Sequence, residues 1–144
     1  MIKNERQYRI TKAQASKFTQ ALREMQGETK RASHPVLHKA QVDALRSQVE
    51  DLARELTEYQ ALRSGKRKVV ALNSLEDLPR TLIQGRIAAG LSQEELAAKL
   101  GVKPQQVQRY EATEYRSASL ERVNEVARAL GIKLRHRAEF RLAS

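Results

Sequence analysis

The sequence predicts a mostly α-helical protein in which an N-terminal helical hairpin is followed by a bundle of short helices and one C-terminal β-strand. Three observations support this prediction. Aliphatic residues of the first half recur in alternating steps of three and four, the spacing of a helix that buries one stripe. Residues 79–131 contain short apolar-periodic segments with serine, proline and glycine at their ends. After Gly131, apolar and charged residues alternate one by one, as in a strand.

Residues 1–64 form the predicted hairpin. Its first helix begins at Thr11, where Thr11 and Gln14 have the spacing of a capping box, and its second runs from about Val36 to Arg63. The second helix carries an apolar stripe at heptad spacing: Val42, Leu45, Val49, Leu52, Leu56 and Tyr59. This helix would be roughly 40 Å long, which is too long to be buried by a small globule. Two arrangements remain open: the first helix folds back on the second, or the stripe binds a second copy of the chain.

Charge and composition narrow the classes of function. The 144 residues hold 27 Lys and Arg against 17 Asp and Glu, so the formal net charge is +10. This balance favours polyanionic partners, nucleic acid first and an anionic membrane surface second. Cysteine is absent, which excludes disulfide scaffolds, thiolate metal sites and cysteine nucleophiles.

Targeting signals are not expected either. The N-terminus is polar and lacks the apolar core of a signal peptide. The longest aliphatic run, residues 69–72, is far shorter than the roughly 20 residues of a membrane helix. We therefore expect a soluble, cytoplasmic protein with no membrane partner.

Residues 65–78 are the predicted linker, in which a glycine and three cations, Gly65 to Lys68, follow the hairpin. The run 68–72 is either a short strand or extended linker. Residues 74–77 have the pattern of a capping box and predict one turn of helix. The predicted helices of the bundle then run from Arg80 to about Ala89, from Ser92 until Gly101 stops that helix, from Pro104 to Tyr110, and from the cap Ser119 to a point before Gly131.

The most specific pattern lies between residues 93 and 111, where two short helices meet across a glycine. Ala97 is small at the point where the two helices must approach closely, and Gly101 can adopt the positive φ of a sharp turn. Val102 and Val107 would pack the second helix onto the first. Side chains that match base edges in the major groove remain on or near the outer face of the second helix: Lys103, Gln105, Gln106, Gln108 and Arg109.

With its flanks, this pattern resembles the Xre (lambda-repressor-like) helix-turn-helix family from about Leu78 to Ile132, rather more than a third of the chain. Glycines, alanine, capping serine and core aliphatic residues fall at the family spacing. The resemblance implies a five-helix DNA-binding bundle, of which four helices are evident within residues 79–131. Lys103 and Pro104 depart from the family, whose recognition helix begins with a hydroxyl cap and a polar residue. Base reading then depends more on three residues: Gln105, Gln106 and Arg109.

The resemblance also implies contacts outside the recognition helix. Gln93 stands at the start of the preceding helix, where free N–H groups favour a phosphate, and would contact the DNA backbone. Arg86 and Glu111 would form an ion pair that fixes the recognition helix, and Tyr110 points inward by its spacing. In the loop after this helix Arg116 is the best candidate for a phosphate ligand, and the alternative is a surface cation. That loop, which the family places at the phosphates, holds Thr113, Tyr115, Arg116 and Ser117.

Residues 132–144 are the predicted C-terminal strand, with one interruption of the alternation at His136. A lone amphipathic strand needs a sheet edge or an identical strand. Some antitoxins with this type of DNA-binding domain pair such a strand across a dimer, and this tail is similar. The predicted dimerisation residues are Ile132, Leu134, Phe140 and Leu142. The alternative is a frayed basic tail.

Catalysis has little support in the sequence. His34 and His38 have the i, i+4 spacing of a zinc helix but lack its glutamate and third ligand, so no metal site is expected. Neither a Gly-rich phosphate loop nor a nucleophile elbow is present. We therefore expect neither an enzyme nor a cofactor.

The resulting hypothesis is a sequence-specific repressor that binds double-stranded DNA as a homodimer on an inverted-repeat operator. The alternative is the antitoxin of a type II toxin–antitoxin pair that represses its own operon, with the N-terminal helices bound to a protein toxin. A third hypothesis is a structural adaptor built on the long N-terminal helix.

Overall fold

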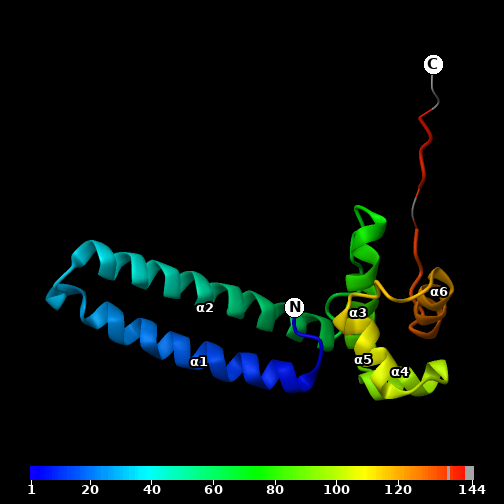
Figure 1. The fold of residues 1–144 in the computed structure, drawn as a ribbon, viewed down its shortest axis with the longest axis horizontal. Helices are drawn as coiled ribbons and strands as arrows, with labels where there is room; N and C mark the ends of the chain where they lie inside the picture. Colours follow the sequence, from blue (N-terminus) through cyan, green and yellow to red (C-terminus); the bar gives the residue numbers. More distant parts are fainter. Residues whose placement is uncertain (136, 142–144) are drawn as a thin grey trace. The chain divides into compact units, whose positions relative to one another are not determined.

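The computed structural model describes residues 1–135 and 137–141 (Figure 1). These residues contain six α-helices, two single-turn 3₁₀ helices and no β-strand. The chain divides into two compact units, Met1–Ala61 and Leu62–Ser144. Each unit has its own arrangement of helices, and the second contains the short helices, one of which carries the predicted recognition residues.

The first unit is a pair of long helices that lie side by side and antiparallel (Figure 1). Its elements are α1 (Glu5–Gly27), η1 (Thr29–Arg31) and α2 (Pro35–Arg63). Helix α1 begins six residues before the predicted start at Thr11 because Asn4 caps it. The Asn4 side-chain oxygen accepts a hydrogen bond from the N–H of Gln7 at 2.9 Å. Of the two arrangements that the sequence left open, the first helix folds back on the second.

Contacts at the open end of the hairpin join its two helices. The rings of Tyr8 in α1 and Tyr59 in α2 stack with their centroids 5.1 Å apart. The Tyr8 hydroxyl accepts a hydrogen bond from the Gln60 amide at 2.6 Å, and the ammonium group of Met1 pairs with the Glu55 carboxylate at 3.0 Å. Tyr59, the last residue of the heptad stripe of α2, therefore packs against α1.

The second unit is a bundle of short helices whose starts follow local sequence. Its elements are η2 (Leu75–Asp77), α3 (Leu78–Ala88), α4 (Gln93–Leu100), α5 (Pro104–Ala112) and α6 (Leu120–Ala129). Ser92 and Glu95 form a complete capping box at the start of α4, and Ser74 and Asp77 form another at η2. The bundle core is formed by aliphatic side chains that are at most 3 % exposed: Leu82, Ile83, Ile87, Leu96, Ala97, Val107 and Val126.

The predicted C-terminal strand is wrong for the residues that the structure describes. Gly131, with φ of +66°, ends α6, and the N–H of Ile132 donates to the carbonyl of Ala127 at 2.9 Å. This hydrogen bond completes a helix cap instead of opening a strand. The side chain of Ile132 packs against α3, so closely that a β-carbon added to Gly85 would lie 2.6 Å from its Cδ1 atom. Ile132 thus packs within its own bundle and is not free to join a partner's strand.

Leu134 and Phe140, also predicted to lie at the dimer interface, are not part of a strand. Leu134 is 42 % exposed and Phe140 is 87 % exposed. Leu142, like His136 within the predicted strand, lies outside the described residues. The alternation of apolar and charged residues gives this segment the side-chain pattern of a strand. A strand also needs a neighbouring strand for its backbone hydrogen bonds, and the described residues contain no strand. The run 68–72 is likewise extended linker.

Candidate nucleic-acid interface

Helices α4 and α5 meet through a tight glycine turn. Gly101 adopts a φ of +66°, and the N–H of Val102 donates to the carbonyl of Ala97 at 3.0 Å, which closes the end of α4. Ala97 is fully buried and Val107 is 1 % exposed, so the two helices are in close contact on their inner faces. The turn therefore positions α5 with its opposite face toward solvent.

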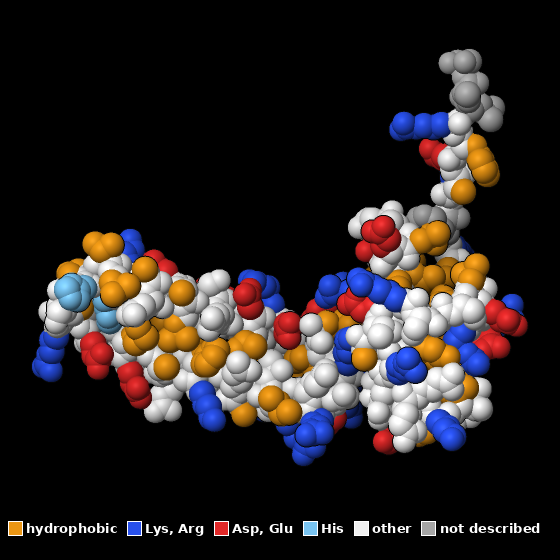
Figure 2. Space-filling view, in the orientation of Figure 1, with side chains coloured by type: hydrophobic (Ala, Val, Ile, Leu, Met, Phe, Trp, Pro, Cys, Tyr) orange, Lys and Arg blue, Asp and Glu red, His pale blue; other side chains and the backbone are white. Residues whose placement is uncertain are grey.

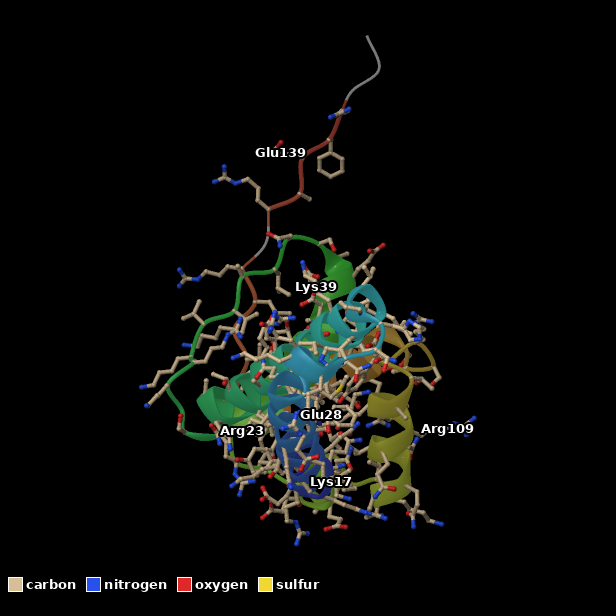
Figure 3. All side chains as sticks on the ribbon, turned by 90° about the vertical axis from the view of Figure 1, so that its left-hand side faces the viewer. Lys17, Arg23, Glu28, Lys39, Arg109 and Glu139 are labelled. Carbon is tan, nitrogen blue, oxygen red and sulfur yellow. The ribbon has the colours of Figure 1, made fainter. Side chains whose placement is uncertain are left out.

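The outer face of α5 presents polar side chains that nothing in the bundle covers. The exposed residues on it are Lys103, Gln105, Gln106, Gln108 and Arg109. Figure 3 shows the Arg109 side chain pointing away from the bundle. Gln105 and Arg109 are four residues apart and share one helix face. Pro104 occupies the first turn and has no N–H to offer a base or a phosphate.

Two stacked tyrosines, Tyr110 and Tyr115, lie behind the outer face of α5. The side-chain amide of Gln106 donates to the Tyr110 hydroxyl at 2.8 Å, and the Tyr110 ring stacks on that of Tyr115 with centroids 5.9 Å apart. Tyr110, which its spacing places in the core, is half-buried, whereas Tyr115 is only 4 % exposed. Gln106 is therefore oriented along the helix by Tyr110, while Gln105 and Arg109 point outward.

A buried charge network fixes α5 to α3. Arg86 donates from Nε and Nη2 to the two carboxylate oxygens of Glu111, at 2.5 and 2.8 Å, and from Nη1 to the carbonyl of Leu91 at 2.8 Å. Gln93 donates from its side-chain amide to the same Glu111 carboxylate at 2.7 Å. Arg86 is 2 % exposed and Glu111 is fully buried. The network thus joins α3, the loop after it, α4 and α5 at one point.

Gln93, predicted to contact a phosphate, has a structural partner in this network. Its amide uses one hydrogen on Glu111, and a primary amide has a second hydrogen to donate. The side chain lies at the N-terminus of α4, where backbone N–H groups and the helix dipole favour an anion. Gln93 is therefore half-buried and anchored on the bundle through Glu111.

The loop after α5 is built on the buried Tyr115. Glu114 and Tyr115 both have positive φ angles, 49° and 57°, which cost strain in residues other than glycine. The N–H of Tyr115 donates to the carbonyl of Tyr110 at 2.7 Å, which holds this conformation. Burial raises the pKa of the Tyr115 phenol far above its ordinary value, and the Glu111 carboxylate raises it further, against the opposing effect of Arg86. Tyr115, expected at the phosphates, is thus an uncharged buried side chain.

A shallow hollow of about 500 Å³ lies on this loop, lined by Ala112, Thr113, Glu114, Arg116 and Ser117. The Thr113 hydroxyl, which is within hydrogen-bond distance of the carbonyls of Arg109 and Tyr110 at 3.0 and 3.3 Å, serves the end of α5. Arg116 is exposed at the hollow and is the cation that this loop offers to a ligand. The hollow is open to solvent, and its lining combines the Arg116 guanidinium with the Glu114 carboxylate.

Comparison with known families agrees with this geometry. Residues 82–136 match the model of a helix-turn-helix family. They form a helix-turn-helix domain of the Xre, lambda-repressor-like family. No curated protein and no solved structure matched the chain.

The helix-turn-helix domain spans most of α3 and all of α4, α5 and α6, so it contains the glycine turn and the network around Glu111. Domains of this family belong to DNA-binding transcription regulators, and the chain is accordingly one with a DNA-binding domain. The α1–α2 hairpin lies outside the matched residues.

Other kinds of site have no support in the described part of the chain. The His, Asp and Glu side chains there form no group of three or more that could hold a metal ion. His34, which is exposed, and His38, which is half-buried, lie near the start of α2. Among the described helices, none combines the length and the apolar character of a membrane span.

The sequence did not reveal all the groups that support the helix-turn-helix domain from behind, and it placed one of them, Tyr115, in the phosphate-binding loop. Tyr115 and Leu91 are examples, since one is a buried ring in a polar loop and the other contributes only its carbonyl. A signal existed for Tyr115, because a second aromatic residue five positions after Tyr110 is unusual in a chain with 4 % aromatic residues. For Leu91 the sequence held no signal, because any residue has a carbonyl group.

Proposed function

We propose that this chain is a sequence-specific transcriptional repressor that binds double-stranded DNA as a homodimer. One observation about α5 carries the proposal. Its outer face exposes side chains that can contact bases, while its inner face is fixed to the rest of the bundle. Gln105 and Arg109 point to solvent from the same helix whose Glu111 is held by Arg86. A reading helix that is already in place loses little freedom on binding, which favours affinity and selectivity.

The chemistry of the exposed face matches base edges. Arginine donates two parallel hydrogen bonds to guanine, and glutamine makes a donor–acceptor pair with adenine. Gln105 and Arg109 are the proposed readers, with Lys103 and Gln108 at the margins of the face. Arg116 and the second amide hydrogen of Gln93 are the proposed phosphate contacts, which position the domain without reading sequence.

The proposed homodimer follows from the size of the reading helix. Helix α5 has nine residues, of which two or three can reach base edges, and this reads only a few base pairs. Two copies related by a two-fold axis double the reading and place half-sites roughly 34 Å apart, or a multiple of that distance. The operator is therefore expected to be an inverted repeat, at which the bound protein blocks a promoter.

The experiment that tests this proposal is selection of genomic DNA fragments by the purified full-length chain, followed by binding titrations. The selected fragments should share an inverted repeat. Affinity for that repeat should exceed affinity for a scrambled duplex by about 10³-fold or more, and it should fall steeply with salt. Equal affinity for both duplexes at every salt concentration would contradict a sequence-specific function.

A further inference from the structure

The α1–α2 hairpin has an apolar stripe on each helix. The half-buried positions of α1 include a heptad-spaced set of six: Tyr8, Thr11, Ala15, Phe18, Leu22 and Met25. The described residues of α1 include no fully buried side chain, although the helix has 23 residues. An amphipathic helix of a stable bundle normally buries its apolar stripe, so α1 is covered on one side only.

Helix α2 shows the same incomplete burial in its middle. Val42 is buried near one end of the stripe, and Tyr59 and Leu62 are buried near the other. Between them, four aliphatic positions are only half-buried: Leu45, Val49, Leu52 and Leu56. The stripe is thus buried at its two ends and incompletely covered along about 16 Å of its centre, at 1.5 Å per residue.

The open stripes of the two helices form one continuous surface. Figure 2 shows hydrophobic side chains gathered along the hairpin, with charged side chains at its borders. Two helices alone cannot enclose a core, because each seam position has neighbours on one side only, whereas four helices can. The missing cover is therefore another pair of helices.

The charges on the hairpin indicate which pair of helices fits. Helix α1 carries five Lys or Arg and two Glu side chains, whereas α2 carries four Lys or Arg and five Asp or Glu side chains. A second hairpin placed with its α2 against α1, and its α1 against α2, brings the net positive helix against the net negative one at both contacts. Charges that flank a helical seam set partner choice in this way.

We propose that this surface, the half-exposed seam of α1 and α2, is covered by the same surface of a second copy of the chain. The two hairpins form a four-helix bundle in which α1 of one copy packs on α2 of the other around a two-fold axis. The inference deepens the proposed function and rests on it for its biological role, because it supplies the dimer that an inverted-repeat operator requires. It replaces the C-terminal strand as the site of dimerisation.

The first test is the molar mass of the full-length chain in solution without DNA, by sedimentation equilibrium. The expected mass is twice the 16.4 kDa of one chain. Phe18→Glu, on the half-exposed seam, should weaken the dimer at least tenfold. Ser16→Glu is the matched control, because it adds the same charge to the same helix at an exposed position and should leave the dimer intact.

A second measurement covers the case in which Phe18→Glu loses helicity and fails to fold. The chain has no cysteine, so Ser16→Cys gives a single labelling site, and copies labelled with donor and with acceptor dyes are mixed. Energy transfer between copies is expected, because the hairpins lie side by side. A monomer at 50 µM, a dimer that Phe18→Glu leaves unchanged, or a dimer without energy transfer would each overturn the inference.

The two proposals fail separately. A chain that is monomeric without DNA but selects an inverted repeat retains the proposed function, with a dimer that forms on the operator, and loses the hairpin interface. A chain that dimerises through the hairpin but binds every duplex equally retains the interface and loses the proposed function. Mass is measured without DNA for this reason.

Discussion

Arg86 in α3 and Glu111 at the end of α5 form a buried ion pair with two hydrogen bonds, of 2.5 and 2.8 Å. Their side chains are 3 % and 0 % exposed, so water neither screens nor replaces the interaction. The same Glu111 carboxylate accepts a hydrogen bond from Gln93 at the start of α4. The orientation of the reading helix therefore depends on one carboxylate that three elements share.

Removing one partner of this pair should destabilise the helix-turn-helix domain. Arg86→Ala or Glu111→Ala alone should cost about 3–5 kcal/mol, because each leaves an uncompensated buried charge. The double variant should cost clearly less than the sum. Hydrogen exchange at the amides of α4 and α5 measures the change and separates this domain from the hairpin. Free-energy losses that add to within about 0.5 kcal/mol would show that the two side chains do not interact.

The two exposed arginines of the interface should differ in what they do to DNA binding. Arg109→Ala should cost about 1–3 kcal/mol on the selected operator and relax its base preference, as loss of a bidentate base contact does. Arg116→Ala removes the same charge from the phosphate-binding loop and serves as the matched control. It should weaken operator and scrambled duplex equally. Equal losses on both duplexes for Arg109→Ala would remove Arg109 from the readers.

The contact between Gly85 and Ile132 should make a side chain at position 85 unfavourable. A β-carbon there would lie 2.6 Å from Cδ1 and 3.2 Å from Cγ1 of Ile132. Overpacking of this kind costs about 1–3 kcal/mol, and the roughly 1 kcal/mol that alanine gains over glycine in a helix offsets part of that cost. Gly85→Ala should therefore lower the melting temperature. Adding Ile132→Ala should remove the clash, so that Gly85→Ala is no longer destabilising in that background.

The capping box of α4 should respond to acid. The N–H of Ser92 donates to the Glu95 carboxylate at 2.7 Å, and this hydrogen bond, followed by the one with the Ser92 side chain, lowers the pKa of Glu95. A lowered pKa stabilises the fold above the ordinary value near 4.5, and this stabilisation disappears as the pH falls through the folded-state value. Amide exchange in the first turn of α4 should accelerate over that range in the parent chain. Glu95→Gln should be less stable than the parent at pH 6 and nearly equal to it at pH 3. If the stability difference between Glu95→Gln and the parent chain were the same at both pH values, the charge of Glu95 would not contribute to the cap.

Local features of the chain could be predicted well from the sequence. The capping boxes at Ser74 and Ser92 start their helices, and the turn at Gly101 joins α4 to α5, because such features depend on residues within four or five positions. The start of α1 was placed too late because Asn4 caps the helix before Thr11 does. The resemblance to the Xre family also paired Arg86 with Glu111, 25 residues apart, which composition and periodicity do not do.

The sequence alone determined a basic helical chain with a helix-turn-helix segment, because helix caps, glycine turns and heptad spacing are local patterns. Only the tertiary structure decided which partner each side chain has. Ile132 alternates like a strand residue but packs on Gly85, and Tyr115 lies in a polar loop but is buried against Tyr110. A local sequence pattern specifies the side of the backbone on which a side chain lies. The residues that the side chain packs against are distant in the chain, and they are brought to it only when the chain folds.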